Sequence, residues 1–250
     1  MLTLAALSLA ALNPIVVHDH AESSPLSAVG GGPPAAYGRA VPARAGGEWL
    51  QYWLYYDYQD QDRGIVRAGR HEGDWELVQL RVTDAGRPVE AVYAQHSGAE
   101  RCGADELTFR GGRPLVFAAH GSHASYLRAG TRDRMWPDPN DEADGRGPVV
   151  APRLVEITRD SPSWMRRSTP WGDSRGRWWV PPEQDSPRGP VFQPDRWDPE
   201  AFAAAAGPCR AACDEVGECD GPEKALTIAG VLAALLAAWR LARHARVRNG

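Results

Sequence analysis

The residues best suited to chemistry lie at the start of an apolar segment, in the stretch RHEGDWELVQLRV over residues 70–82. If this segment is a β-strand, alternate side chains share a face, so Asp74 and Glu76 point the same way as the valines and leucine that follow them. Two carboxylates about 7 Å apart on an apolar face repel each other. They are also costly to bury, so we expect a positive charge beside them.

A histidine and a glycine precede these carboxylates. Gly73 permits a bulge that turns His71 to the same side as Asp74, whereas Glu72 projects elsewhere. One imidazole and two carboxylates suit a hard divalent ion, so the expected cofactor is Mg²⁺, Ca²⁺ or Mn²⁺ rather than Zn²⁺.

The alternative to a metal is that the carboxylates pair with arginines. Arg70 and Arg81 flank them in the same segment, and a neighbouring strand can supply another arginine. Both interpretations satisfy the need for positive charge.

Further acidic residues lie in two other segments. YYDYQDQD offers Asp57 on a strand as a fourth oxygen ligand, followed by Asp60 and Asp62, for which a solvated acidic turn is the simpler interpretation. DPNDEADG, residues 138–145, is similar to a calcium loop, but its glycine is not at the sixth position that an EF-hand requires. We expect a surface loop there.

Two more predicted strands end in histidine. VYAQHSG contains His96, and VFAAHGSHASYL contains His120 and His123 around a turn. A single histidine of this kind is usually a core residue, but three apolar strands that end this way can line one cleft, which Ser122 and Tyr126 would share. If the ion activates water for hydrolysis, His120 or His123 is the expected general base.

The composition indicates one β-rich domain. The chain has 250 residues, 43% of them hydrophobic, and a net charge of −4, which argues against a nucleic-acid partner. Apolar segments about ten residues apart, separated by turn signals such as DAGRP and RGGRP, predict an all-β fold. We expect an antiparallel β-sandwich with long loops over residues 15–207, wrapped by the tryptophan- and proline-rich residues 160–200. DPEAFAAAAG is expected to be a helix.

Both ends differ from this domain. Residues 1–14 are apolar but lack the basic start of a signal peptide, so they are a weak or clipped signal or the first helix of the domain. Residues 225–242 contain one charge, Arg240, and precede a basic tail over residues 243–250. This pattern predicts a transmembrane helix, with an amphipathic or core helix as the alternative.

The four cysteines are Cys102 and, in a linker over residues 208–224, Cys209, Cys213 and Cys219. Their spacings do not match a zinc site, so we predict two disulfides in an exported protein, with connectivity open. The expected location is the cell membrane, with the main domain extracytoplasmic.

Three strings resemble, in order and spacing, the vacuolar protein sorting-associated protein 62 family: HEGDWELVQLRV, VYAQHSG and RPLVFAAHGSHASYL. This resemblance extends over about residues 14–207 and is most specific through residue 127. The biochemical role of that family is poorly defined, so it implies no activity.

More remotely, HEGDWE is similar to the heptapeptide of the necrosis- and ethylene-inducing cytolysins, a β-sandwich family. There the corresponding residues bind a divalent cation at a surface that recognises sphingolipid glycans. The resemblance implies His71, Asp74 and Glu76 as ligands, with Asp57 nearest in register to a fourth ligand and Gln59 as its competitor.

Three functions follow, in order of preference. The first is a membrane-anchored, divalent-cation-dependent module that binds a glycan, lipid head group or envelope polymer. The second is a metal-dependent hydrolase with a histidine-lined cleft, and the third is a structural envelope protein. Since no nucleophile elbow or phosphate loop is found, enzymatic activity stays undecided.

Overall fold

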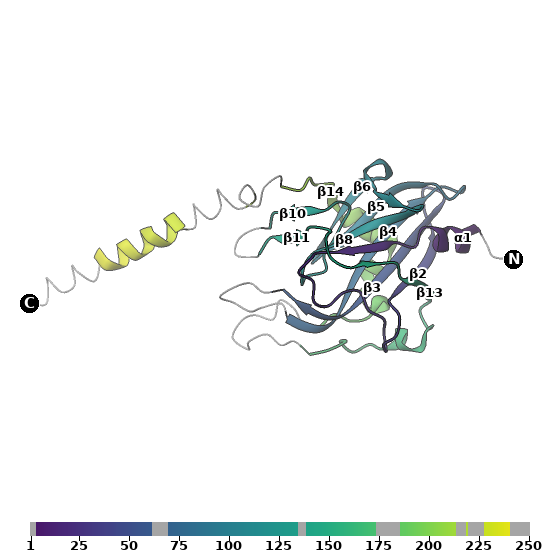
Figure 1. Ribbon diagram of the computed structural model, residues 1–250, viewed down its shortest axis with the longest axis horizontal. Coiled ribbons are helices and arrows are strands. Elements are labelled where there is room, and N and C mark those ends of the chain that lie inside the picture. Colours follow the sequence, from purple (N-terminus) through teal and green to yellow (C-terminus); the bar gives the residue numbers. More distant parts are fainter. Residues whose placement is uncertain are drawn as a thin grey trace, which may run out of the picture.

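The computed structural model describes residues 4–61, 70–134, 139–173, 186–213, 219 and 228–240. Most of the domain consists of β-sheet, as expected, and two sheets pack against each other (Figure 1). The larger sheet contains, in spatial order, β13 (Arg153–Glu156), β2 (Ala35–Pro42), β3 (Glu48–Asp60), β4 (Arg70–Val82), β5 (Pro88–Gln95), β6 (Gly98–Gly103) and β14 (Gly207–Pro208).

The smaller sheet covers one face of the larger one. It contains β12 (Val149–Val150), β1 (Ile15–His18), β8 (Arg113–Ala118) and β7 (Phe109–Arg110), with β9 (Ser125–Tyr126) paired to β8. A separate hairpin is formed by β10 (Gly130–Arg132) and β11 (Asp141–Ala143).

The central ladder from β2 to β6 is antiparallel, as predicted, but the sheets are not antiparallel throughout. The pairs β1–β8, β2–β13 and β6–β14 are parallel. Each joins strands that are far apart in the sequence, so no short hairpin turn dictates their direction.

Strands β3 and β4 are buried on both faces. Leu50, Leu54 and Val78 lie in the core between the sheets, whereas Trp53 and Leu77 point to the opposite face. This double burial explains why both strands are almost continuously apolar.

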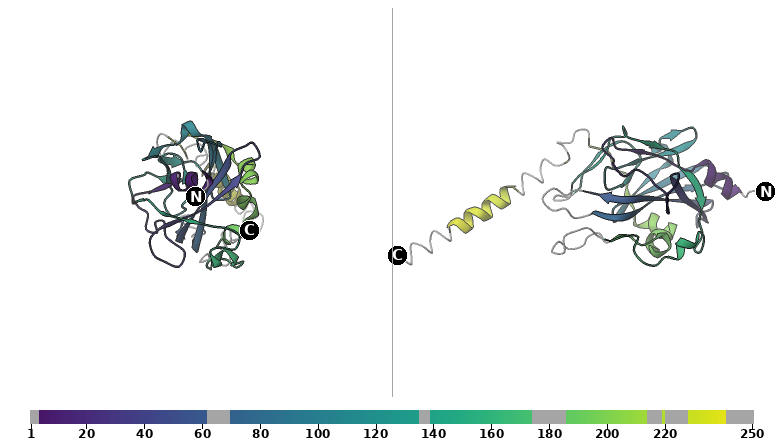
Figure 2. Two further views of the ribbon diagram at one scale, coloured as in Figure 1. Left: turned by 90° about the vertical axis from the view of Figure 1, so that its right-hand side faces the viewer. Right: turned by 60° about the horizontal axis from the view of Figure 1, so that its bottom comes forward.

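The opposite face is covered by the segment that was expected to wrap the domain. Its short elements are η2 (Ser163–Arg166), η3 (Pro190–Phe192), α2 (Pro194–Trp197) and α3 (Pro199–Ala205), and the green helices lie against this face in Figure 2. Trp197 is buried in this face, and Trp164 and Trp171 pack against it partly buried, so these tryptophans stabilise the sheet.

The N-terminal residues form α1 (Leu4–Ala11). Leu9 and Leu12 are buried in the core between the sheets, and the hydroxyl of Tyr52 donates a hydrogen bond to the Leu9 carbonyl at 3.0 Å. Residues 4–11 are thus helical, and the end of this helix packs against the core. The remaining 3₁₀ turn is η1 (Ala104–Glu106).

The predicted transmembrane helix is wrong. The described C-terminal helix covers residues 228–240, and among the described residues no helix is long and apolar enough to cross a membrane. Residues 225–227 and the tail from 241 onward lie outside the described residues, and the membrane partner inferred from this helix is withdrawn.

Both predicted disulfides are present. Cys102–Cys209 joins β6 to the segment after α3 across a sequence separation of 107, and Cys213–Cys219 spans a separation of 6. The first bond therefore restricts the unfolded chain far more than the second.

Replacing Cys102 and Cys209 by serine should lower the free energy of unfolding by about 4 kcal/mol, because the long loop gains conformational entropy in the unfolded state. The matched control, serine at Cys213 and Cys219, should lower it by about 2 kcal/mol. Urea denaturation without reductant measures both values. Equal losses of unfolding free energy in the two variants would contradict the conclusion that Cys102–Cys209 restricts the unfolded chain more than Cys213–Cys219.

Candidate functional site

The first half of β4 carries the predicted carboxylates into the core. Asp74 pairs in register with Tyr56 of β3, and Glu76 pairs with Leu54. Asp74 is 5% exposed and Glu76 is 4% exposed. The predicted strand parity is therefore confirmed, and both carboxylates share the face of Val78 in the core between the sheets.

Gly73 permits the turn that precedes them. Its φ of +64° lies in the left-handed region, and a Cβ at this position would lie 2.7 Å from the Cβ of Trp171. Both observations require glycine here. The predicted bulge is not observed, because the pairing of β3 with β4 continues past Gly73 without a shift in register, from Tyr56 and Asp74 to Gln59 and His71. His71 is nevertheless buried, with Nδ1 at 3.2 Å from the Gly73 carbonyl oxygen, and burial lowers its pKa.

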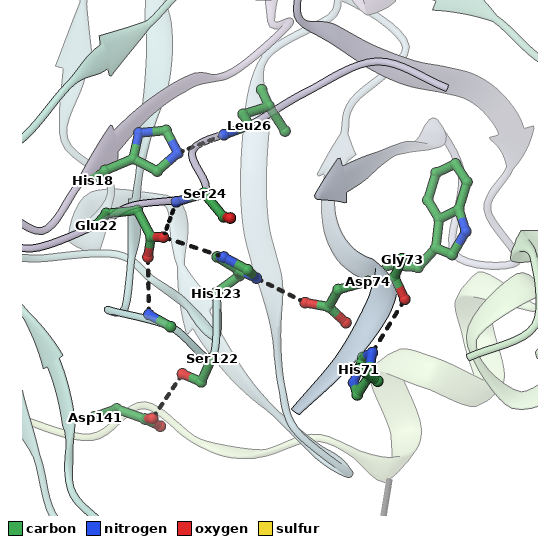
Figure 3. Close-up of polar contacts among 12 residues, drawn as sticks. His18, Glu22, Ser24, Leu26, His71, Gly73, Asp74, Ser122, His123 and Asp141 are labelled. Atoms are coloured by element: carbon green, nitrogen blue, oxygen red, sulfur yellow. Dashed lines mark hydrogen bonds and ion pairs between the residues drawn. The ribbon is translucent and has the colours of Figure 1, made fainter. Parts of the chain in front are cut away.

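The charge beside Asp74 comes from a histidine of another segment (Figure 3). His123 Nδ1 lies 3.0 Å from Asp74 Oδ2, and His123 Nε2 lies 3.7 Å from Glu22 Oε1. The imidazole is fully buried and stacks on the ring of Tyr56 at 3.8 Å. Burial alone would lower the pKa of His123, but Asp74 and Glu22 raise it to about 9, so the ring is positively charged at neutral pH.

Glu22 completes this buried row of charges and was missed in the sequence. Its carboxylate accepts hydrogen bonds from the backbone N–H of Gly121 at 2.8 Å and of Ser24 at 2.7 Å. Burial opposes ionisation of Glu22, but the hydrogen bond and charge of His123, with these N–H groups, lower its pKa to about 2. Glu22 lies in a short polar loop, with no motif to link it to a histidine about a hundred residues away.

Glu76 has no comparable partner. Within the described residues, its buried Oε2 has no hydrogen-bond partner, and the charge of Arg196 lowers its pKa only in part. Burial, Asp74 and Asp141 together raise the pKa of Glu76 well above its ordinary value. The uncharged form is therefore favoured unless a cation binds.

The alternative prediction that arginines neutralise the two carboxylates is not observed. Arg70 pairs with Asp60, and Arg81 pairs with Glu90. Both arginines lie near the surface, whereas the carboxylates point into the core. The compensating charge therefore comes mainly from His123, and the charge of Arg196 in α2 makes a smaller contribution.

Three predicted cleft residues converge on a second buried carboxylate. Asp141 is 1% exposed and accepts hydrogen bonds from Ser122 Oγ at 2.9 Å and Tyr126 OH at 2.6 Å. His96 Nε2 lies 2.7 Å from Asp141 Oδ2, the oxygen that also accepts the hydrogen bond from Tyr126. The expectation of a surface loop over residues 138–145 is thus wrong for Asp141, because β11 pairs with β10 and brings this side chain inward. Asp138 lies outside the described residues.

Other predicted residues do not join the cluster. Asp57 is exposed, accepts a hydrogen bond from Ser27 Oγ at 2.6 Å, and lines a surface hollow with Trp171. Gln59, which pairs in register with His71, is buried instead. His120 is exposed, and Asp62 lies outside the described residues.

The predicted ligand atoms of His71, Asp74 and Glu76 are not gathered around one point. In the described part of the chain, the group whose ligand atoms all lie within 4.8 Å of one another is Asp19, His20 and Asp144. These residues are satisfied by mutual and backbone hydrogen bonds. Asp74 instead directs Oδ2 toward His123.

Replacing Glu22 by glutamine should lower the free energy of unfolding by about 1–2 kcal/mol at pH 7, because the charge of His123 loses one partner. The depressed pKa of about 2 means that the contribution of Glu22 is complete above its ordinary value of 4.5 and is lost as the pH falls toward 2. The two proteins should therefore converge in stability over this acid range. Urea denaturation at several pH values tests this, with the exposed Glu156→Gln as control. A difference in the free energy of unfolding between wild type and Glu22→Gln that is the same at pH 3 as at pH 7 would contradict the prediction.

Comparison with known proteins supports the resemblance seen in the motifs. The model of the family described as vacuolar protein sorting-associated protein 62 matches residues 59–134. The Saccharomyces cerevisiae protein of that name is 26% identical, with 59% of this chain and 42% of the yeast protein aligned. The chain thus spans less than half the length of this relative.

Two of the solved structures that the chain matches, both with TM-scores below 0.5, are NLP proteins. The non-toxic HaNLP3 protein is 13% identical with a TM-score of 0.49, and the match covers 84% of this chain and 94% of HaNLP3. NLPPya in complex with glucosamine is 14% identical with a TM-score of 0.40, covering 61% of this chain and 72% of NLPPya. In sequence, the chain is similar to the vacuolar protein sorting-associated protein 62 family over the segment that contains His71, Asp74, Glu76 and His123.

Proposed function

We propose that this protein is a divalent-cation-dependent binding module. The ion would be held by His71, Asp74 and Glu76, and the ligand would be a glycan, a lipid head group or an envelope polymer. The predicted ion is Mg²⁺, Ca²⁺ or Mn²⁺.

The observation that carries this proposal is the buried Glu76 carboxyl. Its Oε2 has no hydrogen-bond partner, and Asp74 on the same face adds negative charge. A buried polar atom without a partner is destabilising by about 1–3 kcal/mol. A cation would supply the missing partner and the missing charge in one step.

The donor set fits such an ion in chemistry and burial. Two carboxylates offer oxygen ligands, and burial keeps His71 neutral, which is the form that binds metals. Tyr56 OH is also buried without a hydrogen-bond partner beside this cluster. A bound ion would offer free coordination positions to hydroxyl or phosphate oxygens of a ligand.

A hydrolase receives less support from the same geometry. A general base must be unprotonated and within reach of the attacking water. His123 is fully buried, faces a carboxylate at each ring nitrogen, and carries a proton at neutral pH. His120 is exposed, with its backbone N–H bonded to Glu142.

We also propose that the domain is extracytoplasmic. The two disulfides support this location, since such bonds persist in oxidising compartments. Fractionation followed by thiol labelling of intact and lysed cells would test it.

Glu76→Gln is the sharpest test of the cation site. The isosteric amide removes the charge, so it should abolish the rise in melting temperature that Ca²⁺, Mg²⁺ or Mn²⁺ produces in the wild type. For a concentration 100 times the Kd, that rise corresponds to about 2.7 kcal/mol. In chelator, the variant should be at least as stable as the wild type, because an unfavourable buried carboxyl is gone.

Asp74→Ala is a less specific test, because it also leaves the His123 charge with fewer partners. Glu142→Gln, on the exposed side of β11, is the matched control and should keep the full cation response. An equal rise in the wild type and in Glu76→Gln would overturn the proposed site.

Glycan and lipid arrays probed with and without chelator then test the binding function. If the protein is retained on an array only when the divalent cation is present, the result supports a binding module. Turnover of ester or phosphoester substrates that needs the ion would favour the hydrolase instead, and a cation response without any ligand would favour a structural role.

A further inference from the structure

We propose that a hollow beside the Cys102–Cys209 disulfide binds an oxyanion through the guanidinium groups of Arg132 and Arg210. This hollow has a volume of about 390 Å³ and is distinct from the cation site. Its charged lining residues are Glu100, Glu106, Arg128, Arg132 and Arg210.

Arg132 is the buried element of this hollow. The residue is 6% exposed, and its guanidinium donates hydrogen bonds to two backbone carbonyls, Thr131 at 3.4 Å and Arg128 at 3.2 Å. Within the part of the chain that the structure describes, its buried Nε has no hydrogen-bond partner. The guanidinium also lies 4.9 Å from the centre of the Tyr126 ring, which holds its plane in place.

The positive charge of Arg132 has no counter-ion in contact. Among the described residues, no carboxylate forms an ion pair with Arg132 or Arg210, whereas Glu106 is already paired with Arg128. Glu100 is buried, and burial raises its pKa, which weakens it as a counter-charge. A buried guanidinium without an ionic partner is unfavourable, so an anion in the hollow would be stabilising.

Two connections position the wall that faces Arg132. The disulfide holds Cys209 beside β6, and the backbone N–H of Cys213 donates to the Thr131 carbonyl at 3.0 Å. A Cβ at Gly130 would lie 2.5 Å from Ala212 Cβ and 3.1 Å from Arg132 Nη1, so this wall and the guanidinium are close together. The hollow is therefore built by packed and covalently joined segments.

The shape of a guanidinium selects the class of ligand. Its planar N–H groups match the paired oxygens of carboxylate, sulfate or phosphate, which it binds in a bidentate manner. Such a group occurs both as a free inorganic anion and as a substituent of an acidic glycan. The proposal concerns the oxyanion, and the experiment distinguishes the two sources.

The test is calorimetric titration of the full, oxidised chain with sulfate, phosphate and an oligogalacturonate, at constant ionic strength and in the presence of chelator. Chelator removes any contribution of the cation site, so failure here is separate from failure of the proposed function. We expect saturable binding of at least one probe. Preference for the oligogalacturonate would identify a glycan source, and equal or tighter binding of sulfate or phosphate a free anion.

Variants then assign the binding to this hollow. Arg132→Gln should weaken binding by at least about tenfold, the range for a charged hydrogen bond. Arg210→Gln, at an exposed position, should weaken it without unfolding the protein. Glu106→Gln should strengthen it, because Arg128 loses its partner, and Arg110→Gln on β7 is the charge-matched control.

Absence of saturable binding in the wild type would overturn the proposal. So would equal binding by wild type, Arg132→Gln and Arg210→Gln, which would show that the anion binds elsewhere. If Arg132→Gln fails to fold, the opposite responses of Arg210→Gln and Glu106→Gln still decide the result.

Discussion

The structure depends on one buried positive charge between two carboxylates. His123 lies between Asp74 and Glu22, fully inside the core, and its ring stacks on Tyr56. These residues come from a turn after β8, from β4, from a loop after β1 and from β3. Because ionic hydrogen bonds in a low-dielectric interior are strong only when the geometry is satisfied, this contact joins the two sheets at one defined position.

The same constraint explains the difference between the two carboxylates of β4. Asp74 has a charged partner and stays ionised. Glu76 lies two residues later on the same face, where burial and the negative charges of Asp74 and Asp141 raise its pKa and disfavour its ionised form. An apolar residue would be more stable at this position. The carboxyl is thus an unfavourable group in an otherwise well-packed core, which is the pattern that a binding site produces.

The outer face of the large sheet is stabilised in a different way. Trp75, Trp164 and Trp171 pack against one another at ring distances of 5.4–5.6 Å, and the absence of a side chain at Gly73 leaves room for Trp171. The aromatic packing on one face therefore supports the strand that carries the polar cluster on the other. The strand is rigid because both of its faces are occupied.

Local patterns in the sequence determined much of this protein. Period-two alternation identified β3, β4 and β5, the parity of Asp74 and Glu76, and the need for a glycine at residue 73, because a strand sets side-chain direction from its own neighbours. Cysteine spacing identified the two disulfides. The apolar C-terminal run, by contrast, suggested a membrane span, and among the described residues no helix is long and apolar enough to form one.

Only the tertiary structure decided which charges meet. Glu22 and Asp141 carry no local motif, Asp57 was expected inside and lies outside, and the arginines near the carboxylates pair elsewhere. The parallel pairs β1–β8 and β6–β14 and the pairing of Cys102 with Cys209 are also contacts between distant segments. Such contacts depend on how the two sheets close over the core, and no periodicity within a single segment contains that information.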